Sequence, residues 1–285
     1  MQLRTGELAL MRQLALQLTG VALDESKGYL IETRLGAIAE RLGCNNFNEF
    51  YFRTRYQADP KLLEEIVEAI TTHETIFFRD GAPFEALQFK LLPEVIDARE
   101  RMGQNKRLRI WSAACSTGQE PYSIGMVVHE LLRSLDGWDV QILATDIAKP
   151  TLETAQRGVF AEHDVARSQK PLLMQKYLEK TPGGMRVVDS VRRLVQFRQL
   201  NLLEPFGAHG PFDIVFLRNV LIYFAAETRL DIARRVAGTL LPHGWLVVGA
   251  AENLLDAGPQ FAPQTHCRAT VYQPAVQPVA PAGRR

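Results

Sequence analysis

The run from Leu108 to Tyr122, LRIWSAACSTGQEPY, constrains the fold of this chain more than any other stretch. An apolar strand ends there in small residues, and a helix begins at Glu120 and Pro121, residue types that favour a first helical turn. Small side chains let the backbone approach a ligand closely. The pattern therefore predicts a cofactor-binding turn between a strand and a helix of an α/β sheet.

This turn differs from the dinucleotide-binding fingerprint, which has three glycines at fixed offsets and leaves a helix N-terminus free for a pyrophosphate. The run holds one glycine, Gly118, and the carboxylate of Glu120 stands where a phosphate would lie. A carboxylate repels phosphate and attracts a cationic ligand. S-adenosylmethionine, which carries an ammonium and a sulfonium group, is the common cofactor of that kind, so the turn favours it over a nucleotide phosphate.

Composition narrows the class of protein. The 285 residues are 46% hydrophobic and 23% charged, enough for one large domain and a smaller one. The net charge of +1 gives no general attraction for nucleic acid, so we expect no nucleic-acid partner. Residues 1–18 are amphipathic, with no apolar run near the roughly 18 residues that a membrane span needs. We therefore expect a cytoplasmic protein without membrane insertion.

Cysteine usage points to a reducing compartment. Cys44, Cys115 and Cys267 are odd in number and far apart, which suits neither a disulfide framework nor a metal site. We expect reduced thiols and no metal. Cys115 lies in the cofactor turn, where a helix start could make a thiol reactive, but a small apolar filler is the favoured interpretation.

Two periodicities divide the chain. Residues 1–75 show helical periodicity and predict an N-terminal all-α domain. From Leu108 strands alternate with helices, which predicts an α/β domain over 76–273 with a doubly wound, mostly parallel, Rossmann-like sheet. Strands are expected at 108–113, 140–145, 212–218, 245–251 and 269–273, and helices near 83–101, 120–134, 149–157 and 226–240.

Two segments stand apart from this alternation. After a turn signal at 181–184, residues 185–199 read as a short hairpin, so a small antiparallel β-subdomain is expected as an insertion over about 160–200. Residues 274–285 are rich in proline and hold too few large apolar groups to pack, which predicts a disordered tail.

Polar side chains follow two of the predicted strands. Asp146 follows the second, where an acidic group can accept hydrogen bonds from both hydroxyls of a ribose, with a helix N-cap as the alternative. Arg218 and Asn219 follow the third and are placed to line the crevice at that edge. Tyr223 lies there too, or else is a core aromatic. Amino-group methyltransferases often carry an N/D-P-P-Y run at this edge, and its absence favours an oxygen nucleophile.

The segment TTHETIFFRD, residues 71–80, joins the two predicted domains, and junctions are common ligand sites. In the alternative interpretation, Phe77 and Phe78 pack the domains together while Arg79 pairs with Asp80 at the surface.

The sequence resembles the CheR-type chemotaxis receptor (protein-glutamate) O-methyltransferases. The runs that carry the resemblance are TTHETIFFRD, RIWSAACSTGQEPYSIGM, ATDI, QLNLL, FDIVFLRNVLIYF and AAENL, in the family's order and with similar spacing. It covers residues 1 to about 273. It implies an N-terminal helical domain joined to an S-adenosylmethionine-binding α/β domain with a small inserted β-subdomain.

The resemblance also implies roles for residues. Arg79 and Tyr223 would flank the transferred methyl group as the catalytic pair. His73, at a position where family members often carry Asn, is included among the cofactor-binding candidates. The others are Thr75, Arg79, Glu120, Asp146, Asn201, Leu202, Arg218 and Asn219.

The implied activity is methylation of glutamate side chains on methyl-accepting chemotaxis receptors, which forms glutamyl methyl esters and S-adenosylhomocysteine. A glutamate side chain, with a pKa of about 4.3, is ionised at neutral pH and needs positioning rather than a strong base. Arg79 can orient that carboxylate, and the Tyr223 hydroxyl can steer it. A crevice of low polarity lined by Phe77, Phe78 and Ile222 would favour the reaction of an anion with a cation.

The helical domain offers a basic stripe to the cytoplasmic helical bundle of a receptor. Lys27, Arg34 and Arg41 are spaced by seven and share one helix face, although a solvated face paired with Glu40 and its neighbours is the alternative. The loop TPGG at 181–184 looks shorter than in members that dock a receptor-tail pentapeptide, which argues against such docking.

Other classes of function stay open. A small-molecule carboxyl methyltransferase would need no basic stripe. A non-catalytic module that senses S-adenosylmethionine or S-adenosylhomocysteine would tolerate loss of Arg79 and Tyr223, so the intact pair favours the enzyme. A related enzyme acting on a signalling array outside chemotaxis is not separated by the sequence.

Overall fold

The structure is a computed structural model that describes residues 1–274 apart from 104, 133–136, 207–208, 255–257 and 259–260. The predicted disordered tail at 274–285 therefore lies outside the described residues, except for Pro274, which ends a strand. None of the described helices is long and apolar enough to cross a membrane.

Helices alone form the N-terminal part, as its periodicity predicts. Asn46 and Asp59 cap two of them, each accepting a hydrogen bond from a backbone N–H three residues on, and Pro60 begins the fourth. Their apolar faces bury a core that includes Met11 and Phe47. The helices are α1 (Glu7–Thr19), α2 (Gly28–Arg41), α3 (Phe47–Gln57) and α4 (Pro60–Ile70), with the short 3₁₀ helix η1 (Glu25–Lys27) before α2.

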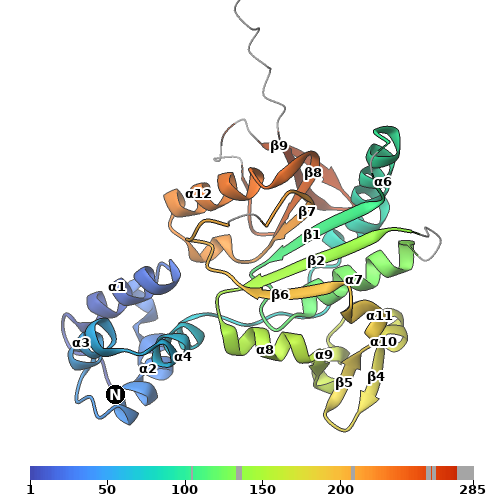
Figure 1. The fold of residues 1–285 in the computed structure, drawn as a ribbon. Helices are drawn as coiled ribbons and strands as arrows, with labels where there is room; N and C mark the ends of the chain where they lie inside the picture. The colour runs from blue at the N-terminus through green and yellow to red at the C-terminus, as the bar shows by residue number, and fades with distance from the viewer. Residues whose placement is uncertain (104, 133–136, 207–208, 255–257, 259–260, 275–285) are drawn as a thin grey trace, which may run out of the picture.

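A seven-stranded sheet organises the rest, in the order β6-β2-β1-β7-β8-β10-β9 (Figure 1). Strands β6, β2, β1, β7 and β8 run parallel, whereas β10 is antiparallel to β8 and β9. This topology confirms the predicted doubly wound, mostly parallel sheet. The strands are β1 (Arg107–Ala113), β2 (Asp139–Asp146), β6 (Val195–Gln199), β7 (Phe212–Leu217), β8 (Leu240–Val248), β9 (Phe261–His266) and β10 (Ala269–Pro274).

Helices cover both faces of this sheet. One core contains Leu108 and Ile142 of the sheet together with Leu91 and Ile124 of the helices on one side, and a second core places α12 against the other side. The predicted helix near 83–101 contains a π-helical turn, since Pro93 has no N–H to donate. The helices are α5 (Ala82–Ala86), the π turn η2 (Leu87–Leu91), α6 (Leu92–Arg101), α7 (Gln119–Leu132), α8 (Lys149–Arg157) and α12 (Ala226–Ala237).

The predicted hairpin over 185–199 is wrong, because its first residues pair with strands that precede them, at 159–160 and 178–181, rather than with 195–199. β6 pairs in parallel with β2 as an edge strand of the main sheet. Val195 and Phe197 pack toward the core while Gln196 and Arg198 are exposed, the alternation of an edge strand. The small antiparallel sheet has the order β3-β5-β4. Its strands are β3 (Val159–Phe160), β4 (Leu178–Thr181) and β5 (Gly184–Val187), and the helices near it are α9 (Glu162–Ala166), α10 (Pro171–Tyr177) and α11 (Asp189–Arg192).

The helical part lies beside the sheet at the end where the parallel strands finish (Figure 1). The backbone N–H of Ala22 donates to the carbonyl oxygen of Tyr223 at 2.8 Å, just after α1 and at the end of the 3₁₀ helix η3 (Leu221–Tyr223). The side-chain amide of Asn201 donates to the Leu18 carbonyl at 3.3 Å. Residues far apart in the sequence are thus joined at the sheet edge where α/β folds bind ligands.

Candidate active site

One cavity lies between the helical part and the carboxyl ends of the strands. Leu23 and Leu30 line it from the helical part, and Ala114 and Ile147 line it from the segments after β1 and β2. All ten predicted site residues line this same cavity: His73, Thr75, Arg79, Glu120, Asp146, Asn201, Leu202, Arg218, Asn219 and Tyr223.

The turn after β1 has the close backbone geometry that its small residues predict. Ala114, Ser116 and Gly118 all have positive φ, at 59°, 51° and 96°. A Cβ on Gly118 would lie 2.9 Å from the Cβ of Ala155 in α8, so only glycine fits. The turn therefore lies tightly between β1 and α8, with its N–H groups facing the end of β2.

Asp146 is the buried carboxylate at that strand end. Its Oδ2 accepts the N–H of Ser116 at 2.8 Å and its Oδ1 accepts the N–H of Ala148 at 3.0 Å. Burial raises the pKa of the Asp146 carboxyl, although both N–H groups and His73 act in the opposite direction. The second bond fixes the segment before α8, but α8 has Ala148 as its N-cap without a side-chain cap, so the N-cap interpretation of Asp146 is wrong. Its place in the cavity wall suits a hydroxyl-bearing ligand, and the ribose contact stays a prediction.

Glu120 and Arg218 form the centre of a buried ionic network. Arg218 donates to Glu120 at 2.8 Å and to Asp80 at 2.8 Å, and its side chain is only 1% exposed. Ser112 donates to the other oxygen of Glu120 at 2.8 Å. The alternative interpretation, in which Arg79 pairs with Asp80 at the surface, is wrong, because Arg218 holds Asp80 instead. One buried cation thus aligns two carboxylates, of which Glu120 faces the cavity.

Arg79 lies in a short strained segment. Phe78 and Asp80, on either side of it, have positive φ of 55° and 69°, and the N–H of Phe78 donates to the Ser123 hydroxyl at 3.0 Å. Within the described ranges, Arg79 makes one hydrogen bond from its guanidinium, from Nη1 to the carbonyl of Glu74 at 3.0 Å. The remaining N–H groups of Arg79 are available to an anion in the cavity.

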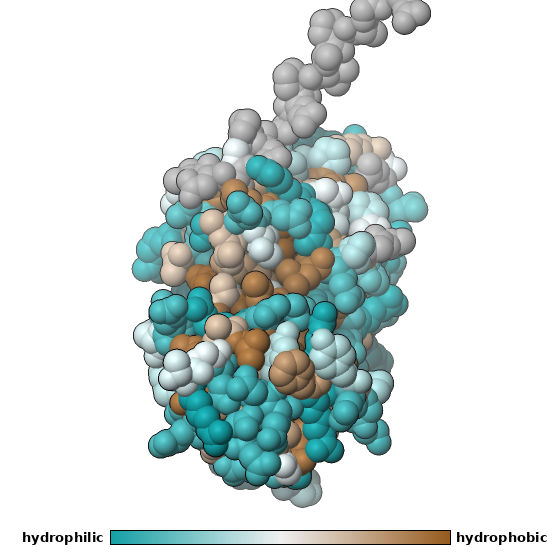
Figure 2. Space-filling view, turned by 90° about the vertical axis from the view of Figure 1, so that its left-hand side faces the viewer, coloured by the Kyte–Doolittle hydropathy of each residue, from teal (hydrophilic) through white to brown (hydrophobic). Residues whose placement is uncertain are grey.

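The apolar wall of the cavity differs from the prediction. Phe77 and Phe78 are both fully buried in the core of the α/β part, so they neither line the cavity, as predicted, nor pack the two parts together, as the alternative interpretation has it. Ile222 lines it and is 52% exposed. Figure 2 views the molecule from the side of the helical part and shows apolar side chains gathered across the middle of a mostly hydrophilic face.

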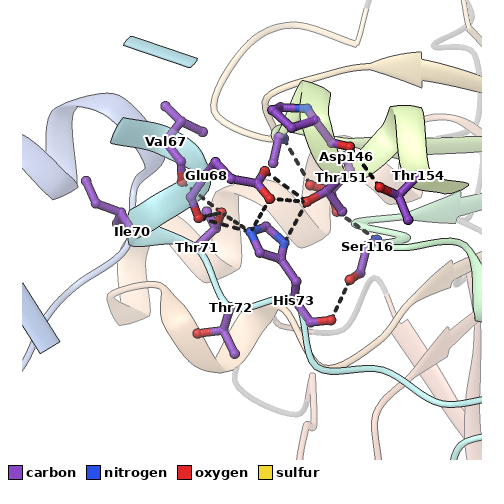
Figure 3. A network of polar contacts seen from close by, with 12 residues as sticks. Val67, Glu68, Ile70, Thr71, Thr72, His73, Ser116, Asp146, Thr151 and Thr154 are labelled. Atoms are coloured by element: carbon purple, nitrogen blue, oxygen red, sulfur yellow. Dashed lines mark hydrogen bonds and ion pairs between the residues drawn. The ribbon is translucent and has the colours of Figure 1, made fainter. Parts of the chain in front are cut away.

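The His73 ring lies among the side chains of Glu68, Thr71 and Thr151 (Figure 3). Its Nε2 lies 3.0 Å from both the Thr71 hydroxyl and the Glu68 carbonyl, and its Nδ1 lies 3.2 Å from the Thr151 hydroxyl. Its own carbonyl accepts the Ser116 hydroxyl at 2.8 Å. His73 thus connects α4, α8 and the turn, so its ring nitrogens are occupied by protein groups rather than open to a cofactor.

The predicted basic stripe is mostly used inside the helical part. Arg34 donates to the carbonyls of Ile70 and Thr71 at 2.9 and 3.2 Å, and Arg41 forms an ion pair with Glu65 of α4. Lys27 is exposed and lines the cavity. Arg34 lines the cavity as well, but it is partly buried and held by those carbonyls, so Lys27 is the more exposed of the two basic residues there.

Cys115 behaves as a small core residue. It is buried, and burial raises the pKa of its thiol well above the ordinary value, so it is not an activated nucleophile. Among the described residues, no group of three or more His, Cys, Asp or Glu side chains is arranged to hold a metal ion.

Sequence reasoning missed two kinds of site residue. Leu23 and Leu30 line the cavity from the helical part, and no local sequence pattern shows that the helical part packs against the ends of the strands. Glu252 lies in the run AAENL, which carried part of the family resemblance without a role, and its carboxylate binds the backbone that follows β7. Its partners are backbone N–H groups, which leave no signature in a sequence.

Comparison with known proteins agrees with this arrangement. Residues 73–270 match the family described as CheR methyltransferase, SAM binding domain, and residues 6–71 match CheR methyltransferase, all-alpha domain. Among solved structures, a TehB-like SAM-dependent methyltransferase from Corynebacterium glutamicum is similar at a TM-score of 0.37 and 15% identity, over 66% of this chain and 89% of that one.

Curated relatives cover most of both chains. The chain is 44% identical over 239 residues to Chemotaxis protein methyltransferase Cher2 of Pseudomonas putida, which spans 82% of this chain and 86% of that protein. It is 37% identical over 268 residues to Chemotaxis protein methyltransferase 2 of Pseudomonas aeruginosa, across 93% and 91% of the two chains. With both parts of the molecule matched and relatives this similar along its length, the chain belongs to the CheR methyltransferase family.

Proposed function

We propose that this methyltransferase transfers the methyl group of S-adenosylmethionine to glutamate side chains of chemotaxis receptors, giving glutamyl methyl esters. One observation carries the proposal: the residues implied for cofactor binding and for methyl transfer line a single cavity that the helical part helps to form. The relatives named chemotaxis protein methyltransferase support a chemoreceptor as the substrate.

The cavity suits S-adenosylmethionine by charge. Asp146 and Glu120 present carboxylate groups to it, and the Asp146 carboxylate is held by two N–H groups at a strand end. We assign Asp146 to the ribose hydroxyls and Glu120 to the cationic part of the cofactor. The ion pair with Arg218 holds the Glu120 carboxylate in place.

The chemistry needs orientation more than proton transfer. When bound, S-adenosylmethionine supplies an electrophilic methyl group whose bond to sulfur breaks as a glutamate oxygen bonds to that carbon, leaving S-adenosylhomocysteine. The free N–H groups of Arg79 hold one oxygen of the substrate carboxylate and leave the other in line with the methyl group. The Tyr223 hydroxyl steers the same carboxylate. No proton moves, so no general base is required.

We propose further that the all-α part, residues 1–75, presents the receptor helices to the domain that spans 76–273. Lys27 is exposed at the cavity and would meet acidic residues on the receptor bundle. Since methyl-accepting glutamates lie on the cytoplasmic bundle of a receptor, we place the enzyme in the cytoplasm.

The direct test is transfer of radiolabelled methyl from S-adenosylmethionine to a receptor cytoplasmic fragment, followed by mild alkaline release of methanol. Volatile, base-labile label made by the wild type and lost in Arg79→Ala supports the proposal. Label that goes only to small carboxylic acids would replace the receptor by a small-molecule substrate. Cofactor binding with no methyl transfer to either substrate would indicate that the protein senses the cofactor instead of catalysing transfer.

Substrate recognition by the helical part has its own test. Lys27→Glu should raise the KM for the receptor fragment by roughly fivefold, the scale of reversing one exposed charge in a weak ion pair. The Kd for S-adenosylmethionine should not change. Lys61→Glu, an exposed lysine of α4 outside the cavity lining, is the matched control. An equal rise of KM in both variants would assign the effect to net charge rather than to Lys27.

A further inference from the structure

Glu252 is a buried carboxylate that no catalytic role uses. It follows β8, is 7% exposed, and does not line the cavity. Among the described residues it forms no ion pair with a lysine or arginine side chain. A carboxylate buried without a cation needs other hydrogen-bond donors to offset its loss of hydration.

Those donors are five backbone N–H groups. Oε1 accepts from Val220 at 3.0 Å, from Leu221 at 2.8 Å and from Ile222 at 3.3 Å. Oε2 accepts from Asn219 at 2.8 Å and from Gly249 at 2.7 Å. Four of the donors are consecutive, so the carboxylate acts as the anion in a nest of N–H groups.

This nest fixes an unusual piece of backbone. Asn219 has a positive φ of 57°, which is uncommon for a residue with a side chain, and the three residues after it lead into the first turn of η3. Without the carboxylate, buried N–H groups would have no partner in this conformation. The segment leaves β7 and carries two residues of the cavity wall, Asn219 and Tyr223.

The environment of Gly249 independently supports this contact between Glu252 and the segment after β7. A Cβ at this position would lie 2.7 Å from Oε2 of Glu252 and 3.0 Å from the backbone nitrogen of Asn219. The residue directly after β8 therefore has to be glycine for the carboxylate to approach the segment after β7. The residue type at 249 and the acid at 252 serve one arrangement.

We propose that Glu252 is a positioning residue for methyl transfer. It holds the backbone of 219–222 so that Asn219 and Tyr223 face the cavity from the end of β7. This assignment rests on the proposed function for its catalytic readout, while its effect on cofactor binding can be measured without any substrate.

Glu252→Gln is the informative variant. Glutamine has nearly the same shape as glutamate, but its NH₂ group replaces one of the two accepting oxygens. That NH₂ group would then face the backbone N–H groups that donate to the oxygen it replaces. We expect kcat to fall at least about tenfold, which corresponds to about 1.4 kcal/mol. The KM for the receptor fragment should stay within about threefold and the Kd for S-adenosylmethionine should rise, because Asn219 moves and the helical part does not.

Glu7→Gln is the matched control. Glu7 is also fully buried and accepts backbone N–H groups, from Arg4 at 2.7 Å and Asn48 at 3.3 Å, but it lies in the helical part away from the cavity. Both variants should lower the melting temperature, and only Glu252→Gln should lower kcat of the folded enzyme. Equal and small effects of both on kcat would reduce Glu252 to a residue of general stability and overturn the proposal.

A double-mutant cycle separates positioning from stability. If Glu252 acts through Tyr223, then combining Glu252→Gln with Tyr223→Phe should cost little more in kcat than the larger single change. Multiplicative losses would contradict the proposal. If the wild type transfers no methyl to the receptor fragment, the proposed function fails. The cofactor Kd of Glu252→Gln then decides the positioning role: a rise supports it, and an unchanged Kd overturns it.

Discussion

At the scale of single residues, Asp146 is a buried and tightly held carboxylate of the site. It is buried, it accepts two backbone N–H groups, and it lies in the cavity wall. Burial raises its pKa above the ordinary value of about 3.9. The ionised form therefore carries a cost in the folded state that protonation relieves.

The pH dependence of cofactor binding follows from that shift. In its proposed role Asp146 accepts ribose hydroxyls in its ionised form, and as the pH falls through the raised pKa the carboxyl gains a proton and loses acceptor capacity. The affinity for S-adenosylmethionine should therefore decrease toward acid, at a higher pH than an ordinary aspartate would give. Calorimetric titrations at decreasing pH measure this.

Asp146→Asn provides the reference for those titrations. It should bind more weakly by about 1.5–3 kcal/mol, the value of a hydrogen bond to a charged group. Its binding should also lose the acid-dependent decrease. If the affinity of the variant for S-adenosylmethionine decreases toward acid in the same way, the titrating group is not Asp146.

The cysteines give a second prediction at this scale. Cys267 is exposed, whereas Cys44 and Cys115 are buried, and burial raises the pKa of both buried thiols. A thiol reagent should react quickly with one thiol of the native protein and with all three after unfolding. Cys267→Ser should remove the fast reaction, and fast labelling that persists in this variant would show that a buried thiol is accessible.

At the scale of elements, the turn between β1 and α7 depends on Gly118. Its φ is 96° and a Cβ would lie 2.9 Å from Ala155. Gly118→Ala should destabilise the protein by about 1–3 kcal/mol, the usual cost of a strained backbone residue. It should also weaken cofactor binding, because the turn presents the N–H of Ser116 to Asp146.

Gly43→Ala isolates the steric part of that effect. Gly43 also has a positive φ, of 72°, but nothing lies within 4 Å of an added Cβ. Thermal unfolding and calorimetry of both variants should show the larger loss, and the only loss of cofactor affinity, in Gly118→Ala. Equal losses would attribute the cost to φ alone.

Elements with clear periodicity could be predicted from the sequence, and those defined by their partners could not. The alternation of strands and helices after Leu108 gave five strands of the main sheet. β6 was read as part of a hairpin because turn residues precede it, and only its pairing with β2 reveals its place. β9 contains Pro263 and polar residues, so its period is weak. Likewise, resemblance identified the cavity residues, but nothing local identified Glu252.

At the scale of the whole molecule, side chains of α4 connect the helical part to the cofactor turn. Glu68 accepts the Thr151 hydroxyl at 2.8 and 2.9 Å, Thr151 also contacts His73, and the His73 carbonyl accepts Ser116 (Figure 3). Lys149 of α8 pairs with Glu64 at 3.3 Å beside them. The placement of one part thus depends on polar groups of the other.

Thr151→Val tests this connection at constant side-chain shape. The loss of its hydroxyl leaves the Glu68 carboxylate and the His73 ring short of a partner, which should cost about 1–3 kcal/mol of stability. Cofactor affinity should decrease several-fold through the shift of His73 and Ser116. Thr33→Val, whose hydroxyl bonds only within its own helix on an exposed face, should change neither. Unchanged cofactor binding in Thr151→Val would show that this connection between the two parts of the molecule does not affect the cofactor site.

The hydrogen bond from Ala22 to Tyr223 has an evolutionary consequence. It joins two backbones, so it requires no particular side chain at residue 22, and any amino acid except proline can supply the N–H. Descendants of a common ancestor can therefore exchange the residue at this position many times while this hydrogen bond to Tyr223 persists. A different residue type at position 22 in a relative is therefore no sign that this hydrogen bond has been lost.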